Sequence, residues 1–244
     1  MTYTSKNKTR SLKAKLILSS AALVATTILA TPALAHPDES LPGDFSANVS
    51  LTTNYIYRGV TQSDEGPALQ GGFDYNVDLF YIGVWASSVE WTGTSIETDF
   101  YAGFTPSIGD FSFDFGFLYY GYPDSPDGPE QDFYEFYGAV STSLTEGLEV
   151  GVKLSGSPDF YGESGEAWYP EFNASYTFKE DWSLSAHVGQ QSFSDDLYDD
   201  YTDWNISLTY ATEWGDISVG YYDTTDRIGG DEDDSVVLSF SRSF

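Results

Sequence analysis

Ser235-Val-Val-Leu-Ser-Phe-Ser-Arg-Ser-Phe244, the end of the sequence, alternates between two kinds of side chain. A β-strand places successive side chains on opposite faces, so this segment would have one apolar face and one face made mostly of hydroxyl groups. The apolar face carries Val236, Leu238, Phe240 and Phe244. An edge strand of a soluble sheet would alternate in the same way. In a closed sheet, the last strand would instead pair with the first and leave no open edge.

Eleven earlier segments alternate in a similar way, so the pattern covers most of the chain. In one of them, residues 111–119, phenylalanine occupies every second position from Phe111 to Phe117. In another, residues 81–89, the alternation does not say which face is which. The twelve segments are residues 45–57, 69–78, 81–89, 95–104, 111–119, 135–142, 148–154, 168–178, 182–188, 203–210, 217–221 and 236–244.

The connections between these segments follow a rhythm of short and long. Those after even-numbered segments are short, and those after odd-numbered segments are mostly longer, with residues 90–94 as a short exception. Short turns at one rim and long loops at the other are typical of outer-membrane barrels, as is a final aromatic residue, whereas a Greek-key sandwich has no reason to keep this order. We therefore predict an all-β fold for residues 44–244, a transmembrane, antiparallel, up-and-down β-barrel of twelve strands.

Aromatic residues favour an outward-facing apolar surface. Trp204 and Tyr210 flank a short aliphatic stretch, and Tyr55 and Tyr57 lie at the loop end of the first segment. Rings at both ends of an aliphatic band are expected of the girdles at the two membrane interfaces. The opposite face of each strand would then line a polar interior.

The start of the chain has the pattern of an export signal. Five basic residues between Lys6 and Lys15 precede an apolar stretch over residues 16–29, and Ala33-Leu34-Ala35 matches a cleavage site. We predict that residues 1–35 are a secretory signal peptide cleaved near Ala35, followed by a polar leader at residues 36–43. No later apolar run is long enough for a transmembrane helix. The predicted destination is the outer membrane of a Gram-negative bacterium.

Composition excludes several functions. Cleavage would remove five of the ten basic residues and none of the 38 acidic ones, which leaves a net charge of −33. So acidic a protein is an implausible partner for nucleic acid. The sequence has no cysteine, which excludes disulfides, thiolate metal sites and cysteine nucleophiles.

Thr53-Asn-Tyr-Ile-Tyr-Arg-Gly-Val-Thr-Gln-Ser63 resembles a strand-to-loop segment of the TorF-type porin family of Gram-negative outer-membrane proteins. Pro67-Ala-Leu-Gln-Gly-Gly-Phe-Asp-Tyr75 fits that family's second strand, and Tyr81-Ile-Gly-Val-Trp-Ala-Ser87 fits in spacing. The resemblance implies a barrel with a pore and supplies neither a solute nor a set of functional residues. Arg242 departs from the usual barrel ending, because it occupies the apolar face, where an aromatic is commoner. An arginine near the bilayer edge can extend its charge into water.

Charged residues on the predicted inner faces are mostly acidic. Carboxylates in a lumen concentrate cations and repel anions, so we expect a narrow pore that prefers cations. The alternative is that these groups are hydrated or paired with Arg58 or Lys153 across a closed plug. The pore-lining candidates are Arg58, Glu97, Asp99, Glu135, Glu149, Lys153, Glu171, His187 and Asp203.

We predict neither an enzyme nor a cofactor. A Ser-His-Asp arrangement would need His187 with Ser183, Ser185 or Ser207, and no Gly-x-Ser-x-Gly elbow accompanies them. Clustered acids in the longer loops could take Ca²⁺ or Mg²⁺, but their spacing is not that of an EF-hand and a solvated acidic rim is favoured. These weak metal candidates are Asp195, Asp196, Asp231, Asp233 and Asp234.

The predicted function is passive diffusion of small solutes through an outer-membrane porin. The expected partners are outer-membrane lipid, the barrel assembly machinery through the strand that ends at Phe244, and the solutes themselves. One alternative is a non-conducting surface barrel that acts through its acidic loops in adhesion, as a receptor or as a structural protein. Another is a secreted soluble binder resembling a lipocalin.

Overall fold

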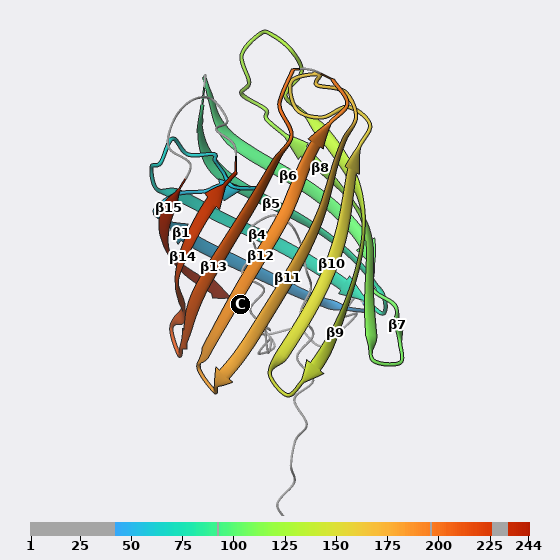
Figure 1. Ribbon diagram of the computed structural model, residues 1–244, viewed down its shortest axis with the longest axis vertical. Helices are drawn as coiled ribbons and strands as arrows, with labels where there is room; N and C mark the ends of the chain where they lie inside the picture. The colour runs from blue at the N-terminus through green and yellow to red at the C-terminus, as the bar shows by residue number, and fades with distance from the viewer. Residues whose placement is uncertain (1–41, 92, 196, 226–233) are drawn as a thin grey trace, which may run out of the picture.

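The computed structural model describes residues 42–91, 93–195, 197–225 and 234–244. The predicted signal peptide, its cleavage site and all but the last two residues of the leader lie outside this range. The described residues form twelve long antiparallel strands closed into a tilted barrel (Figure 1), which confirms the predicted fold class. In the same ranges, no helix is long and apolar enough to span a membrane.

Each long strand pairs with its neighbours along the chain. Of three short strands, two form a separate two-stranded sheet that is not part of the wall, and the third pairs with the start of a long strand. The short strands are β2 (Ile56–Tyr57), β3 (Val60–Thr61) and β7 (Ser107–Ile108). The long strands are β1 (Asp44–Thr52), β4 (Ala68–Val77), β5 (Phe80–Trp91), β6 (Thr94–Phe104), β8 (Phe111–Gly121), β9 (Phe133–Thr145), β10 (Leu148–Ser157), β11 (Ala167–Lys179), β12 (Trp182–Phe193), β13 (Tyr201–Thr212), β14 (Gly215–Thr224) and β15 (Ser235–Ser243).

The last strand closes the barrel against the first. β15 pairs antiparallel with β1, in a register that runs from Asn48 opposite Ser243 to Thr52 opposite Ser239. Main-chain bonds continue past the strand end, because the Ala47 amide donates to the Phe244 carbonyl at 3.2 Å and the Phe244 amide donates to Ala47 at 2.8 Å. The alternating segment that ends the chain is therefore the twelfth strand of the wall, as predicted.

The apolar side of each strand faces outward. Phe45 is 64% exposed and Phe73 on the neighbouring strand is 68% exposed, whereas Trp85 on an inward face is 3% exposed. A soluble β-protein would bury its apolar faces, so this apolar outer belt is suited to contact with lipid. Trp204 and Tyr210 lie on this outer face, as predicted.

One prediction about the faces is wrong. Tyr55 and Tyr57 were expected on the outer aromatic girdle, as continuations of the first strand. Strand β1 ends at Thr52, and the chain then turns into the barrel, where Tyr55 is only 1% exposed. Polar and apolar residues keep alternating beyond Thr52, where the pairing of β1 with β15 stops. The sequence pattern therefore gave no sign that the strand ends there.

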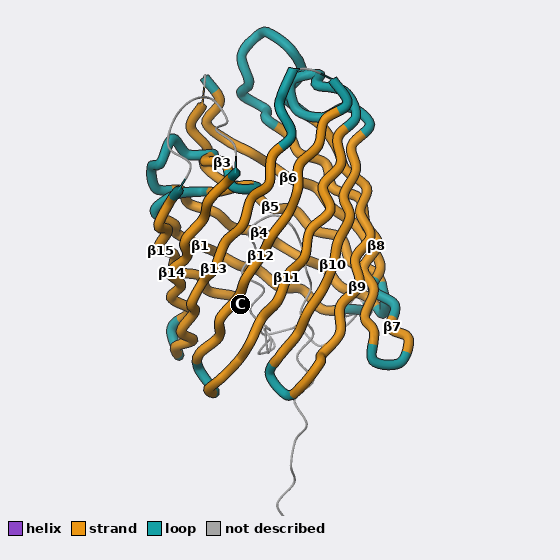
Figure 2. Tube along the Cα trace, viewed as in Figure 1, coloured by secondary structure: helices purple, strands orange, loops and turns teal. Residues whose placement is uncertain are grey.

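The rims of the barrel differ, as the connection lengths predicted. Two-residue turns join β4 to β5, β9 to β10, β11 to β12 and β13 to β14. In one of them, Gly147 adopts φ +82°, and an added Cβ would lie 2.5 Å from the Thr177 carbonyl oxygen, so this tight turn requires glycine. Figure 2 shows the longer loops gathered at the opposite rim.

Candidate functional site in the barrel lumen

A hairpin from the first long loop enters the loop end of the barrel. Its two short strands, β2 and β3, are joined by Arg58 and Gly59, whose φ values are +47° and +80°. Positive φ at both central residues defines the two-residue turn favoured in β-hairpins. An added Cβ at Gly59 would lie 2.3 Å from Thr224 and 2.7 Å from Asp203, so glycine lets the hairpin tip approach the wall closely. We call residues 54–61 the inner hairpin.

Arg58 carries the tip of the inner hairpin into a buried polar site. Its Nη2 donates to Glu135 Oε2 at 2.8 Å, and its Nη1 donates to Gln191 Oε1 at 2.8 Å. The guanidinium also lies over the rings of Tyr57 and Tyr169, at 4.8 and 4.1 Å from their centroids. Charge-assisted hydrogen bonds together with cation–π contacts fix this group strongly. The inner hairpin is thereby fastened to β9, β11 and β12.

Two further carboxylates lie on the inward face of β6. Glu97 accepts a hydrogen bond from the Tyr55 hydroxyl at 2.9 Å. Burial, followed by the charges of Glu97 and Asp99, raises the pKa of Tyr55 well above its usual value, so its hydroxyl keeps the proton that it donates. Asp99 is 1% exposed, and neither of its oxygens has a hydrogen-bond partner among the residues that the structure describes.

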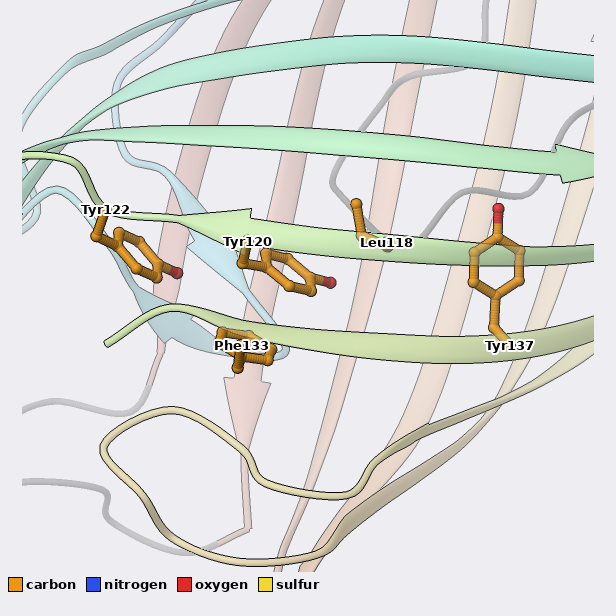
Figure 3. Close-up of a cluster of buried hydrophobic side chains, with 5 residues drawn as sticks. All are labelled: Leu118, Tyr120, Tyr122, Phe133 and Tyr137. Atoms are coloured by element: carbon orange, nitrogen blue, oxygen red, sulfur yellow. The ribbon is translucent and has the colours of Figure 1, made fainter. Parts of the chain in front are cut away.

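Aromatic side chains fill much of the interior near these groups. Leu118, Tyr120, Tyr122, Phe133 and Tyr137 form a buried cluster on the inward faces of β8 and β9 and at the start of the loop that follows β8 (Figure 3). The Tyr120 hydroxyl donates to Glu135 at 3.2 Å and accepts from the Tyr57 hydroxyl at 3.1 Å. The aromatic wall is therefore linked to the inner hairpin by polar contacts as well as by packing.

A second polar group surrounds His187. The Tyr169 hydroxyl donates to Asp203 Oδ1 at 2.7 Å and lies 2.8 Å from His187 Nε2. His187 Nε2 lies 3.2 Å from Asp203 Oδ2, and its Nδ1 lies 2.9 Å from Asn173 Oδ1. Both ring nitrogens are thus occupied by tyrosine, aspartate and asparagine rather than by the serines considered from sequence.

The structure places all nine pore-lining candidates toward the interior and groups some of them. Arg58 pairs with Glu135, and His187 with Asp203. Lys153 lies 4.0 Å from the Tyr137 ring centroid and is the register partner of Glu171 across β10 and β11. Glu149 is half-buried near the short-turn rim, apart from these groups. Their role in conduction stays a prediction.

Sequence reasoning missed the uncharged members of the site, Tyr55, Tyr57, Tyr120, Tyr169 and Gln191. Their role depends on the inner hairpin, which brings Arg58 against strands far along the chain. A local signal for the hairpin was present, because Arg58-Gly59 lies between Ile56-Tyr57 and Val60-Thr61. Glycine at the second position is typical of a two-residue hairpin turn, but arginine is not one of the usual first residues, so this signal was weak.

Of the proposed loop metal ligands, Asp195 and Asp234 are exposed, and Asp196, Asp231 and Asp233 lie outside the described residues. Across the described ranges, no three acidic or histidine side chains come together to hold a metal ion.

Solved structures with a similar architecture are outer-membrane porins and channels. The KdgM porin has a TM-score of 0.58 at 13% identity, covering 82% of this chain and 98% of its own. The NanC porin has a TM-score of 0.54 at 12% identity, covering 81% and 98%. An outer membrane channel from Pseudomonas putida F1 has a TM-score of 0.52 at 12% identity, covering 87% and 100%. At these identities, the likeness shows the fold of a porin-like barrel.

The chain belongs to the Gcw_chp family, described as bacterial protein of unknown function, whose family model matches residues 36–234. No curated protein matches the sequence. The narrower likeness to the TorF-type porins stays a prediction.

Proposed function

We propose that this protein is an outer-membrane pore for the passive diffusion of small cationic and neutral solutes. The observation that carries the proposal is the sign of the charge inside the barrel. Among the described residues, the basic side chains of the interior are Arg58 and Lys153. The inward acidic residues are Asp74, Glu97, Asp99, Asp114, Glu135, Glu149, Glu171, Asp203 and Asp216.

This imbalance favours cations for an electrostatic reason. Charged groups inside a narrow, low-dielectric wall act more strongly than the same groups in water. Carboxylates in excess of ammonium and guanidinium groups therefore attract cations into the lumen and oppose the entry of anions. Neutral solutes small enough to pass would be limited by size.

One of the structurally similar porins suggests a contrast in solute. A structure of the KdgM porin is of a complex with disordered oligogalacturonate, which is a polyanion. The lumen of the present protein is acidic, whereas a lumen that admits a polyanion would be expected to be basic. We therefore propose that the shared barrel serves solutes of a different charge here.

The setting that we propose for the pore follows from the outer surface. The apolar belt suits contact with outer-membrane lipid, and the end of the chain at Phe244 is the segment that we expect the assembly machinery to engage. The predicted signal peptide would supply export from the cytoplasm.

A second function is favoured by one specific observation. The inner hairpin and the aromatic cluster pack the loop end of the lumen, with Arg58 6% exposed and Tyr120 1% exposed. A barrel closed in this way could work through its loops at the cell surface without conducting. Adhesion, reception of a ligand or a structural role would each fit such a barrel.

Reconstitution into planar bilayers separates the two functions. Refolded protein that migrates differently on SDS gels before and after boiling is first selected as folded barrel. The pore predicts discrete conductance steps from this material. Silence across many insertions, with the folded form present, would support the surface barrel instead.

A further inference from the structure

We infer that one part of the lumen wall binds small, uncharged, polyhydroxylated solutes, such as monosaccharides and short polyols. This part is the inward face of residues 173–177 on β11, 183–187 on β12, 205–209 on β13 and 218–222 on β14. We call it the hydroxyl-amide surface. The inference deepens the proposed function, because it names the class of neutral solute that the pore would bind, and it rests on that function for transport.

The hydroxyl-amide surface lies in the open half of the lumen. Along β11, the inward side chains of Tyr169 and Glu171, toward the loops, are buried. Toward the short turns, those of Asn173 and Ser175 are half-buried and that of Thr177 is exposed. The inward face of β12 changes in the same direction. Inward side chains are exposed only where solvent enters the lumen, so a solute can reach this surface from the short-turn rim.

The strand register arranges the polar groups in three adjacent rows. In the middle row, Ser185 on β12 lies opposite Ser175 on β11 and Ser207 on β13. The rows on either side place His187 between two asparagines and Ser183 between two threonines. Opposite side chains lie about 5 Å apart, and inward positions along one strand lie about 7 Å apart. The three rows thus form a compact grid that a single sugar ring can span.

The chemistry of the grid suits hydroxyl groups. Hydroxyl and amide groups both donate and accept hydrogen bonds, as the hydroxyls of a sugar do. The row nearest the loops is partly engaged, because His187 lies 2.9 Å from Asn173 Oδ1 and 3.2 Å from Asp203 Oδ2. Within the four ranges of the surface, no inward position carries a carboxylate, an ammonium or a guanidinium group. A solute with many hydroxyls and no net charge therefore matches the surface better than an ion does.

Ser218 provides independent evidence for a ligand. It is the register partner of Thr209 and extends the row nearest the turns onto β14. Ser218 is only 8% exposed, and its hydroxyl has no hydrogen-bond partner among the described residues, yet it is not sealed from the lumen. A polar group so far withdrawn from bulk water is stabilised by a hydrogen bond. A solute hydroxyl in contact with the grid would supply one.

Tyr222 adds an aromatic ring at the edge of the grid. An added Cβ at Gly220 would lie 2.7 Å from Tyr222 Cε2 and 2.5 Å from Ser207 Oγ, so glycine lets the ring lie close against the wall. Tyr222 and Ser207 also share a hydrogen bond, which fixes the ring beside the hydroxyls. The electron-rich face of an aromatic ring attracts polarised C–H groups, and a sugar ring presents such groups between its hydroxyls.

Saturation-transfer NMR on the whole refolded protein tests the inference without requiring conduction. The protein is held in phosphocholine micelles, because a glucoside detergent would itself present hydroxyls to the surface. Arabinose is the probe. Triethylene glycol is the comparison, because it is neutral, has nearly the same mass and carries mostly ether oxygens, which only accept. We expect saturable transfer to arabinose and several-fold weaker transfer to triethylene glycol.

Variants locate the binding. The double variant Ser183→Ala with Ser185→Ala removes two hydroxyls from adjacent rows and should weaken arabinose binding several-fold. Ser218→Ala should weaken it by a smaller factor. Ser112→Ala removes an exposed inward serine of β8, outside the surface, and should leave binding unchanged. If the double variant does not reach the heat-modifiable folded form, Ser218→Ala and Ser112→Ala still form a matched pair.

Two results would overturn the inference. One is equal transfer to arabinose and triethylene glycol in the unmodified protein. The other is an arabinose affinity that is the same in the folded surface variants as in Ser112→Ala.

Bilayer recordings keep this result separate from the proposed function. Cation-selective conductance without arabinose binding would remove the hydroxyl-amide surface and leave the pore. Arabinose binding to a barrel that does not conduct would keep the surface and remove the pore.

Discussion

Arg58 shows how one residue can determine the state of the lumen. Its side chain is 2% exposed, as is that of Glu135, and the two are joined at 2.8 Å. The residue also adopts a positive φ, which costs energy for any side chain other than glycine. Its hydrogen bonds and ring contacts offset that cost, so the hairpin and the ion pair depend on each other.

Removing only one partner of this pair should be costly. Arg58→Ala leaves Glu135 buried without its counter-charge, and we expect it to lower the free energy of unfolding by about 3 kcal/mol or more. The double variant Arg58→Met with Glu135→Gln removes both charges at similar volume and should recover most of that loss. Urea unfolding of the refolded protein, followed by tryptophan fluorescence, measures both. Equal losses in the single and double variants would show that the ion pair is not the cause.

Asp124 gives a pH-dependent contact outside the membrane-spanning strands. Hydrogen bonds from the Ser95 hydroxyl, and from the amides of Ser95 and Ile96, lower the pKa of this carboxyl, with the hydroxyl having the largest effect. A lowered pKa means that the contact is fully present above the usual carboxyl range and is lost as the pH falls through the folded-state value.

We expect Asp124→Ala to free the loop at residues 122–132 at neutral pH. Limited proteolysis within that loop should then become faster, while Asp127→Ala, which removes a charge from the same loop, should not change it. The Ser95 and Ile96 amides of the unmodified protein should likewise lose their protection against hydrogen exchange, relative to the intrinsic rate at each pH, only as the pH falls below the usual carboxyl range. Unchanged proteolysis of Asp124→Ala would contradict this role.

At the scale of elements, the inner hairpin occupies part of the lumen at its loop end. It is held by the Gln62 amide donating to the Tyr55 carbonyl at 2.7 Å and by the Glu90 amide donating to the Gln62 carbonyl at 2.9 Å. The strands that flank the loop do not need it, because Thr52 and Ala68 are already register partners.

Replacing residues 54–66 with a short Gly-Ser linker should therefore preserve the wall of the barrel and enlarge the open part of its lumen. We expect single-channel conductance to rise several-fold relative to the unmodified protein. Replacing the exposed residues 126–129 with a linker of the same composition is the control and should leave conductance unchanged. Equal conductance in all three proteins would mean that the hairpin does not obstruct the pathway.

The closing strand supports a prediction about assembly. The two main-chain bonds between Phe244 and Ala47 are part of the β1–β15 closure. Deleting Phe244 removes both, so we expect less protein to reach the heat-modifiable folded state, with conductance unchanged in the fraction that does. Phe244→Tyr keeps the ring and the backbone and should assemble normally. Normal yield from the deletion would show that closure does not depend on this residue.

The strands and many of the side chains that face the interior could be predicted from sequence, but the inner hairpin and its contacts could not. Alternation is a local property, so segments such as residues 111–119 and 236–244 revealed their faces directly. The Arg58–Glu135 contact joins residues that are 77 positions apart in the sequence. It depends on the inner hairpin, which follows because β1 ends at Thr52, earlier than the alternation of the sequence predicted. The orientation of residues 81–89 also needed the neighbouring strands, which place Trp85 inward and Ile82 outward.

At the scale of the whole molecule, the two surfaces of the wall have opposite character. The outer side is apolar and the inner side is acidic, and one set of alternating strands produces both. The same periodicity that suits the barrel to a membrane therefore also sets the charge of its interior. The net charge of −28 for the full chain is consistent with an acidic interior and acidic loops.

The sign of the reversal potential tests the central claim most directly. Single barrels in a planar bilayer are placed between unequal concentrations of KCl, and the voltage at zero current is measured. An acidic lumen predicts a reversal potential of the sign set by K⁺ permeation, with a smaller magnitude in high salt because screening weakens the wall charges. A reversal potential of the sign set by Cl⁻ would contradict a cation-preferring pore.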